Sequence, residues 1–495
     1  MSKSIIIIGG GIAGLSTGIY ARMNGFNTDI YEINSIAGGL CTAWKRKGFT
    51  FDGCLHWLTG SAPTSDYYRL WEEIGAVQGK SMYDYEYFSQ ARDEKGNCFT
   101  TWADPEKLRE EMLRLAPEDK KFINHLVGDI KRFMKYGLPA EIKLTNLYPT
   151  IRSLLLLYKY RNPVEYLCKG FSNPTLRNLF RMAFDWGTMC SSFMLWTIAL
   201  MAKKEAGYPM GGSMPFITSV EDRYRKLGGN LHFHKKIEKI LVENDTAVGI
   251  KLTDGEEIRG DIVISAADGH STIFDWLGGK YTGPKIRKMY ETYEPFAPLL
   301  FISLGINGDY STEPHSLTFA LKEPIRVGPD DHKFLFLKNY SYDPSMAPPG
   351  KTVFTLMLPA NYEYWKDLKM DKEKYQAQKK KTGDSVIRAL AEIFPDIKEQ
   401  VEEVDVATPM TFVRYTGNWK GSYQGWVFNK KALSMMAPQT LPGLKNFYMT
   451  GHWVSPGGGL PSGLITGRNA IKMICRKERK RFTTDYTDLH GNRTE

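Results

Sequence analysis

The sequence of 495 residues has few cysteines and histidines, and neither is arranged as a metal site or a disulfide framework requires. Its six cysteines are scattered without a C-x-x-C pair, and its nine histidines form no ligand-spaced cluster with them. Zinc-binding folds and small disulfide-stabilised secreted folds are therefore not indicated. A protein without a resident metal, working in a reducing compartment, is the simplest interpretation.

Long hydrophobic runs are also absent. No stretch reaches the roughly 18 apolar residues that a membrane-spanning helix needs, and the first predicted strand begins at Ile5, which leaves no room for a signal peptide. With 42% hydrophobic and 24% charged residues, the composition is that of a soluble globular protein of two or more domains. We expect a cytoplasmic protein and leave peripheral membrane association open.

The chain has a formal net charge of +10 but no nucleic-acid-binding motif, so we expect no nucleic-acid partner. Its basic residues are spread out, except for a run at 476–481 that we interpret as a solvated tail or as a segment attracted to anionic lipid. The apolar segment Ile151–Arg161 is flanked by cations. It is either a buried helix or one that dips into one face of a membrane.

The N-terminal segment carries the pattern of a dinucleotide-binding βαβ unit. Four β-branched residues, Ile5–Ile8, predict a strand buried on both faces of a parallel sheet. The G-x-G-x-x-G turn that follows consists of Gly9, Gly11 and Gly14, with Ala13 inside it. Its glycines permit a tight turn, a close approach of the pyrophosphate and close helix packing, and the helix N-terminus attracts the pyrophosphate. Glu32 ends the next apolar run, where a carboxylate meets a ribose hydroxyl, so FAD or NAD is expected.

Two further glycine-rich segments favour FAD over NAD. The adjacent Gly38 and Gly39, followed by Leu40, let backbone approach a long extended cofactor. Near the C-terminus, a strand ends at Gly451-His452 and a glycine loop leads through Gly459, Leu460 and Pro461 into a helix predicted from about 464 to 475. The glycine loop of this second strand–loop–helix unit would let a flat ring such as a flavin approach the backbone. We therefore predict FAD as the cofactor.

The sequence resembles the FAD-dependent polyene oxidoreductases, a family of phytoene desaturases, carotenoid isomerases and retinol saturases. The resemblance rests on Gly-Phe-Thr-Phe-Asp at 48–52, on the loop 343–350 and on the segments 407–418 and 421–426. His56, Trp57 and Gly60 match the retinol saturase branch. The chain departs from the family at Cys54, where glycine is usual, and at His452, where many relatives have an acid.

The resemblance implies a fold and further cofactor contacts. It places Ile237 beside the adenine, Ala266 and Ala267 near the diphosphate, and the N-terminus of the last helix at the flavin, where negative charge accumulates on reduction. The fold it implies is α/β, a Rossmann-like FAD-binding domain of the glutathione-reductase or amine-oxidase type with an inserted α+β substrate domain. We expect the FAD-binding domain at 1–75, 205–280 and 435–480, the substrate domain at 76–204 and 281–434, and a polar tail at 481–495.

By resemblance, the protein is an FAD-dependent oxidoreductase that acts on a C–C bond of a long apolar polyene or isoprenoid by hydride transfer at flavin N5. Retinol-saturase-like reduction and phytoene-desaturase-like dehydrogenation are both open, with His56 and His452 as candidates for the proton relay. The alternatives are a flavin-dependent isomerase acting on a carotenoid or fatty acid, an amine oxidase, and a non-catalytic prenyl-binding escort protein with the same fold. The sequence names neither the substrate nor the electron donor or acceptor.

Overall fold

The computed structural model describes residues 2–141, 144–184, 187–432 and 437–484. A five-stranded parallel sheet lies under the N-terminal motif, in the order β19-β13-β1-β2-β9. Its strands are β1 (Ser4–Ile8), β2 (Asn27–Tyr31), β9 (Asn230–His232), β13 (Ile262–Ser265) and β19 (Phe447–Met449). The predicted parallel strand at Ile5–Ile8 is confirmed, and its four isoleucines are all buried. Three distant parts of the sequence therefore build one sheet.

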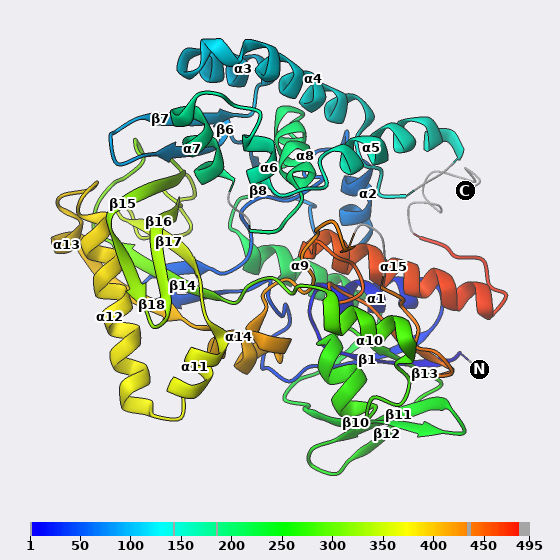
Figure 1. Cartoon of the computed structure of the whole chain (residues 1–495). Coiled ribbons are helices and arrows are strands. Elements are labelled where there is room, and N and C mark those ends of the chain that lie inside the picture. Colours follow the sequence, from blue (N-terminus) through cyan, green and yellow to red (C-terminus); the bar gives the residue numbers. More distant parts are fainter. Residues whose placement is uncertain (1, 142–143, 185–186, 433–436, 485–495) are drawn as a thin grey trace.

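Helices α1 (Ile12–Met23), α9 (Ser213–Lys226) and α15 (Gly459–Lys477) accompany this sheet. Beside it lies an antiparallel sheet of β10 (Ile237–Glu243), β11 (Thr246–Leu252) and β12 (Glu257–Arg259), as Figure 1 shows at its lower edge. The pattern of residues 230–243 by itself predicts a single strand, and this prediction is wrong, because the structure divides the segment into β9 and β10. His234 has a φ of 58°, so the chain turns there and β10 leaves the parallel sheet to pair with β11.

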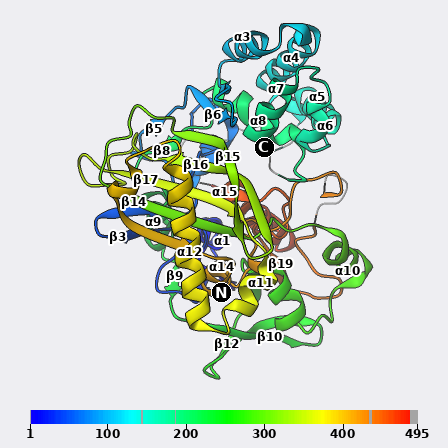
Figure 2. The same ribbon diagram turned by 60° about the vertical axis from the view of Figure 1, so that its left-hand side comes forward.

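A seven-stranded sheet forms a second layer, in the order β18-β14-β17-β16-β15-β6-β7. Its strands are β6 (Tyr87–Arg92), β7 (Cys98–Trp102), β14 (Leu299–Ile306), β15 (Ser316–Val327), β16 (Asp330–Asn339), β17 (Thr352–Pro359) and β18 (Val401–Ala407). Helix α12 (Lys372–Leu390) crosses one face of this sheet, as Figure 2 shows, and is followed by α13 (Ile397–Gln400). Helix α11 (Tyr362–Leu368) precedes α12, and α14 (Pro409–Thr416) lies within the family-like segment 407–418.

A helical layer covers the upper part of the molecule in Figure 1. It consists of α3 (Pro105–Leu115), α4 (Lys120–Tyr136), α5 (Leu147–Lys159), α6 (Val164–Cys168), α7 (Pro174–Ala183) and α8 (Ser191–Ala202). Asp104 caps the N-terminus of α3, because its carboxylate accepts hydrogen bonds from the N–H groups of Glu106 and Lys107. The remaining elements are α2 (Asp66–Glu73), α10 (Gly283–Thr292) and two small sheets, β3 (Ala43–Arg46) with β4 (Phe49–Asp52) and β5 (Met82–Tyr83) with β8 (Tyr208–Pro209).

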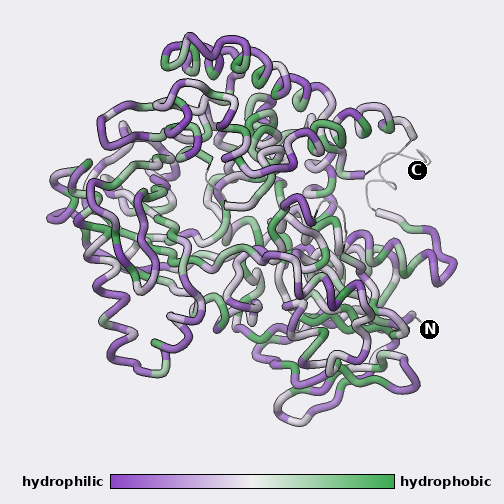
Figure 3. Tube along the Cα trace, in the orientation of Figure 1, coloured by the Kyte–Doolittle hydropathy of each residue, from purple (hydrophilic) through white to green (hydrophobic). Residues whose placement is uncertain are grey.

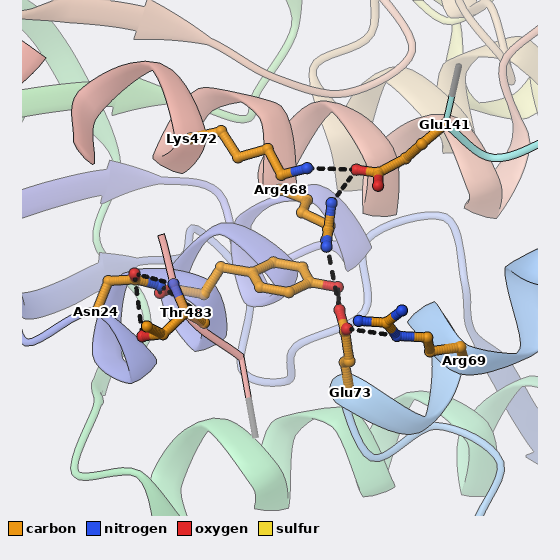
Figure 4. Close-up of polar contacts among 8 residues, drawn as sticks. Asn24, Arg69, Glu73, Glu141, Arg468, Lys472 and Thr483 are labelled. Atoms are coloured by element: carbon orange, nitrogen blue, oxygen red, sulfur yellow. Dashed lines mark hydrogen bonds and ion pairs between the residues drawn. The ribbon is translucent and has the colours of Figure 1, made fainter. Parts of the chain in front are cut away.

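A buried ionic network ties α15 to α1 and α2, and Figure 4 shows its contacts. Glu73 on α2 accepts a hydrogen bond from the Tyr20 hydroxyl at 2.7 Å and pairs with Arg468 of α15 at 3.4 Å. Arg468 also pairs with Glu141, which binds Lys472 at 2.5 Å. Because Glu73 and Arg468 are almost fully buried, each charge is compensated by the other and not by water. This network fixes the helix whose N-terminus reaches the site described below.

The predicted tail at 481–495 is described only to residue 484, and the predicted domain boundary at 434/435 falls outside the described residues. Within the described ranges, no helix combines the length and apolar character needed to cross a bilayer. Within the same ranges, no group of histidine, cysteine, aspartate and glutamate side chains is arranged to hold a metal ion.

Candidate functional site

A cavity of about 1550 Å³ lies between the five-stranded and seven-stranded sheets and contains most of the predicted site residues. The predicted residues in its wall are Gly9, Gly11, Ala13, Glu32, Gly38, Gly39, Leu40, His56, Ile237, Ala266, Ala267, Gly451, His452, Gly459, Leu460 and Pro461. Gly14 is the predicted residue that does not line it. The fold thus gathers residues from both ends of the chain around one space.

The first glycine turn is shaped by backbone conformation and close packing. Gly9 has a φ of 97°, a conformation that favours glycine. A Cβ atom at Gly14 would lie 1.9 Å from the Gly9 carbonyl oxygen, so only glycine lets α1 begin this close to β1. Among the described residues, no side chain caps the N-terminus of α1 at Gly11. Its first N–H groups are therefore free to bind an anion in the cavity.

Glu32 lies at the end of β2 with its carboxylate held by the first turn. Oε2 accepts a hydrogen bond from the Gly10 N–H at 2.7 Å, and Oε1 accepts from the backbone and side chain of Asn34 at 2.9 and 2.7 Å. Glu32 is 4% exposed and lines the cavity. A carboxylate has about four lone-pair directions, so Oε2 keeps the capacity to accept one more hydrogen bond, as a ribose hydroxyl would donate.

Helix α15 crosses α1 so closely that both helix N-termini reach the same cavity. A Cβ atom at Gly463 would lie 2.6 Å from Ile12 Cγ2, and one at Gly467 would lie 2.9 Å from the backbone nitrogen of Thr17. Neither packing glycine is predicted from the sequence, although both follow Gly459 at a helical spacing of four residues. The helix start predicted at about 464 is too late, since α15 begins at Gly459. The earlier start brings Leu460 and Pro461 into the first turn.

The two predicted histidines line the cavity in partly buried positions. The ring of His56 stacks on Phe336 with centroids 6.3 Å apart, and its backbone carbonyl accepts a hydrogen bond from the Tyr85 hydroxyl at 2.9 Å. Burial, together with the nearby Lys338 ammonium, lowers the pKa of His56 to about 3, and burial lowers the pKa of His452 to about 4. Both imidazoles are therefore neutral at pH 7, suited to hydrogen bonding rather than to acting as imidazolium acids.

Strand β13 ends at Ser265 and is followed in the cavity wall by Ala266, Ala267 and Asp268. A Cβ atom at Gly9 would already lie 3.3 Å from the Ala266 carbonyl oxygen, so small residues at this strand end leave space beside the turn. Asp268 accepts hydrogen bonds from the N–H groups of Ser271 and Trp419, at 2.7 and 2.8 Å. Burial raises the pKa of Asp268 to about 6. Ile237, at the start of β10, lines the cavity near these residues.

The rest of the cavity wall is mostly apolar and comes from the helical layer and the seven-stranded sheet. The apolar residues that the helical layer contributes include Leu138, Leu157, Met182, Phe193 and Trp196, and those of the sheet include Phe301, Phe334, Phe336, Met357 and Leu358. Apolar and aromatic walls with few polar groups suit an elongated hydrophobic ligand. Sequence analysis predicted an apolar ligand but none of these wall residues, since nothing in their local pattern separates them from core.

The residues of the cavity fit FAD. The cavity offers the groups that a dinucleotide and a flat ring require. Among the described residues these are the N-termini of α1 and α15, which no side chain caps, the Glu32 carboxylate with its free acceptor site, and the paired glycines Gly38-Gly39. The φ values of Gly38 and Gly39 are 123° and 60°, which a residue with a Cβ would adopt only with strain. A flavin held here would supply two-electron chemistry, while the chain supplies position and an apolar surrounding.

Comparison with known proteins agrees with this site. The family model of the flavin containing amine oxidoreductases matches residues 12–472. A 4,4'-diaponeurosporene oxygenase of Staphylococcus aureus is 23% identical, and the match covers 97% of this chain and 99% of the relative. This similarity supports the resemblance to polyene oxidoreductases.

Solved structures show the same fold at low identity. A cyclohexylamine oxidase from Brevibacterium oxydans is 12% identical with a TM-score of 0.60, over 97% of this chain and 100% of that chain. A Rab GDI from Plasmodium falciparum is 10% identical with a TM-score of 0.52, over 97% and 99% of the two chains. Because the family model spans most of the sequence, the chain belongs to the flavin containing amine oxidoreductase family, and it is an FAD-dependent oxidoreductase.

Proposed function

We propose that this enzyme transfers a hydride between FAD and a C–C bond of a long apolar polyene or isoprenoid. The observation that carries the proposal is the continuity of one cavity from the two helix N-termini to an apolar wall. The curated relative named for 4,4'-diaponeurosporene supports a polyene substrate. We also propose that segments 1–75, 205–280 and 435–480 hold FAD, and that segments 76–204 and 281–434 hold the substrate.

The proposed roles of the chain are binding, orientation and exclusion of water. The glycine turns and Glu32 hold the cofactor, and the aromatic wall aligns the polyene. His56 and His452 remain the proposed proton-relay residues, and each would exchange a proton as a neutral imidazole that passes it between a hydrogen-bonded donor and acceptor. As neutral imidazoles, the two side chains add no positive charge to the site where the hydride is transferred.

The test is anaerobic incubation of the FAD-loaded enzyme with retinol, carotenoid and unsaturated fatty-acid substrates, followed by product mass. A gain or loss of two hydrogens supports reduction or dehydrogenation. An unchanged mass with altered retention supports the alternative, flavin-dependent isomerisation. Turnover of amines alone would overturn the proposal in favour of an amine oxidase. Tight prenyl-lipid binding without turnover would favour the escort function, which the Rab GDI fold keeps as the second candidate.

We further propose that the substrate enters from an anionic membrane at α5. Leu157 of α5 lines the cavity, whereas Leu154 and Leu155 are 50% and 57% exposed on the outer side of the same helix. Figure 3 shows this leucine-rich helix among the hydrophobic segments of the upper layer. Arg161 lies over the exposed Tyr158 ring at 4.0 Å, which places a cation beside the apolar face. Helices of this kind lie in the interface of anionic bilayers.

Sedimentation with vesicles of phosphatidylserine and phosphatidylcholine tests this docking. Burial of each half-exposed leucine contributes about 1 kcal/mol, so a Leu154→Ser/Leu155→Ser variant should bind roughly thirtyfold more weakly. Met370→Ser is the matched control, because Met370 is 89% exposed after α11, outside the helical layer. Equal vesicle binding by both variants and the wild type would contradict the proposed docking face.

A further inference from the structure

Two of the six cysteines, Cys41 and Cys54, lie opposite each other at the open end of the β3–β4 hairpin. The antiparallel ladder pairs Ala43 with Asp52, and the Gly53 N–H donates to the Thr42 carbonyl at 3.0 Å, which extends the register by one pair. Cys41 and Cys54 are the next opposite positions in this register. Although the two cysteines are not adjacent in the sequence, the hairpin brings them together in the fold.

The geometry of this pair suits a disulfide. Because Thr42 and Gly53 share the ladder hydrogen bond, Cys41 and Cys54 fall at the following non-hydrogen-bonded position. Cα atoms at such positions are about 4.5 Å apart, within the roughly 4.4–6.8 Å that a disulfide requires. The neighbouring Cys54 thiol and burial raise the pKa of Cys41 well above its usual value, and the Cys41 thiol donates a hydrogen bond to the Ser213 carbonyl at 3.8 Å. Both are free thiols in the structure.

The pair lies in the wall of the cofactor cavity. Both side chains line the cavity, Cys41 directly after Leu40 and Cys54 two residues before His56. The other four cysteines do not line it.

The backbone of the hairpin end is rigidly held. Asp52 accepts hydrogen bonds from the Cys54 N–H at 2.9 Å and from the Ser213 hydroxyl at 2.6 Å. Cys54 lies outside the left-handed backbone region, so cysteine replaces the glycine usual in the family without backbone strain. Its side chain is therefore available for a purpose that glycine cannot serve.

We propose that Cys41 and Cys54 are a redox-active dithiol through which an external dithiol supplies two electrons to FAD. In the disulfide form, the external dithiol reduces the Cys41–Cys54 bond by thiol–disulfide exchange and leaves as its own disulfide. The two protein thiols then give two electrons and two protons to oxidised FAD, and the Cys41–Cys54 bond forms again. This route rests on the proposed function in its reducing direction, because dehydrogenation of the substrate would need an electron acceptor and not a donor. The neighbouring Cys54, burial and the facing Asp52 raise the pKa of Cys41, so little of its thiolate is present at pH 7.

Thiol counting in the full-length, FAD-loaded protein tests the pair without any polyene. The protein is equilibrated with oxidised glutathione, denatured and alkylated, and its mass and non-reduced peptides are measured. In the wild type, two of the six thiols should escape alkylation and one peptide pair should be joined through Cys41 and Cys54. Cys54→Gly, which restores the family residue, and Cys54→Ser should lose this link. Cys168→Ser removes a buried cysteine outside the cavity and should keep it.

Anaerobic addition of dithiothreitol then measures the electron transfer through bleaching of the flavin band. The wild type and Cys168→Ser should bleach at least tenfold faster than Cys54→Gly and Cys54→Ser at equal FAD content. Alkylation of all six thiols in the wild type would overturn the proposal. So would a Cys41–Cys54 link that leaves the bleaching rate equal in the wild type and both Cys54 variants. Neither readout involves substrate turnover, so failure here is distinguishable from failure of the polyene proposal.

Discussion

The contact between α1 and α15 leads to a quantitative prediction about FAD binding. A Cβ atom at Gly467 would lie 2.9 Å from the Thr17 nitrogen and 3.1 Å from the Ala13 carbonyl oxygen. Backbone atoms cannot rotate away, so the Gly467→Ala variant must separate the two helices by about half an ångström to reach ordinary contact distances. Overpacking of this kind costs about 1–3 kcal/mol.

The cost falls mainly on cofactor binding rather than on folding. Without FAD the helices can move apart, and alanine gains about 1 kcal/mol of helix propensity over glycine, which offsets part of the clash. FAD requires both helix N-termini at their native spacing, so the clash returns on binding. We therefore expect an FAD dissociation constant roughly 5 to 150 times higher than that of the wild type.

Gly128→Ala is the matched control for this prediction. Gly128 lies inside α4, where a Cβ atom would meet nothing within 4 Å, so this variant gains the propensity without the clash. Titration of the FAD-free proteins with FAD, followed by quenching of flavin fluorescence, gives the dissociation constants. If Gly467→Ala and Gly128→Ala bind FAD equally well, the helix crossing does not position the cofactor and the reasoning is wrong.

Three other predictions follow from the buried charges. Arg468→Met should lower the free energy of unfolding, measured in urea, by about 3 kcal/mol, because two carboxylates lose a buried cation. The control variant Arg326→Met breaks an exposed ion pair and should change the free energy of unfolding by less than about 0.5 kcal/mol. Glu32→Gln should weaken FAD binding about tenfold in the same fluorescence titration, because the Gly10 N–H loses an ionised acceptor, and unchanged affinity would contradict the proposed ribose site. The pKa of His452 is lowered to about 4 in the folded protein, so the unfolded chain takes up the proton first as the pH falls below 6.5. Between pH 6.5 and about 4, His452 should therefore lower the free energy of unfolding by about 1.4 kcal/mol per pH unit. His452→Gln should flatten this slope in urea unfolding, and an equal slope would refute the assignment.

The cavity also explains why fold similarity alone does not identify the reaction. A cyclohexylamine oxidase and a Rab GDI both share this architecture, at 12% and 10% identity. The side chains of the cavity wall, among them the aromatic residues of β16 and the Cys41–Cys54 pair, bear on the reaction more directly than the fold does. Function is therefore to be tested at those side chains rather than argued from the fold.

The sequence by itself predicted the proposed cofactor end of the site. Local rules of strand, turn and helix fix the first glycine motif, since a buried strand, three spaced glycines and an acid at the end of the next strand are sufficient to form the cradle. Gly14 was predicted to allow close helix packing. The structure gives the reason, because a Cβ atom at this position would lie 1.9 Å from the Gly9 carbonyl oxygen. The second glycine motif was found for the same reason, although α15 starts five residues earlier than predicted.

Only the tertiary structure decided the rest. The apolar wall and the crossing at Gly467 depend on contacts between segments remote in the sequence. The strand break at His234 and the pairing of Cys41 with Cys54 depend on local backbone geometry that the sequence pattern does not indicate. Contacts between remote segments leave no local periodicity, because a wall residue and a core residue present the same apolar side chain to the sequence pattern. The neutral state of His56 and His452 likewise follows from burial, which the fold imposes and no motif records.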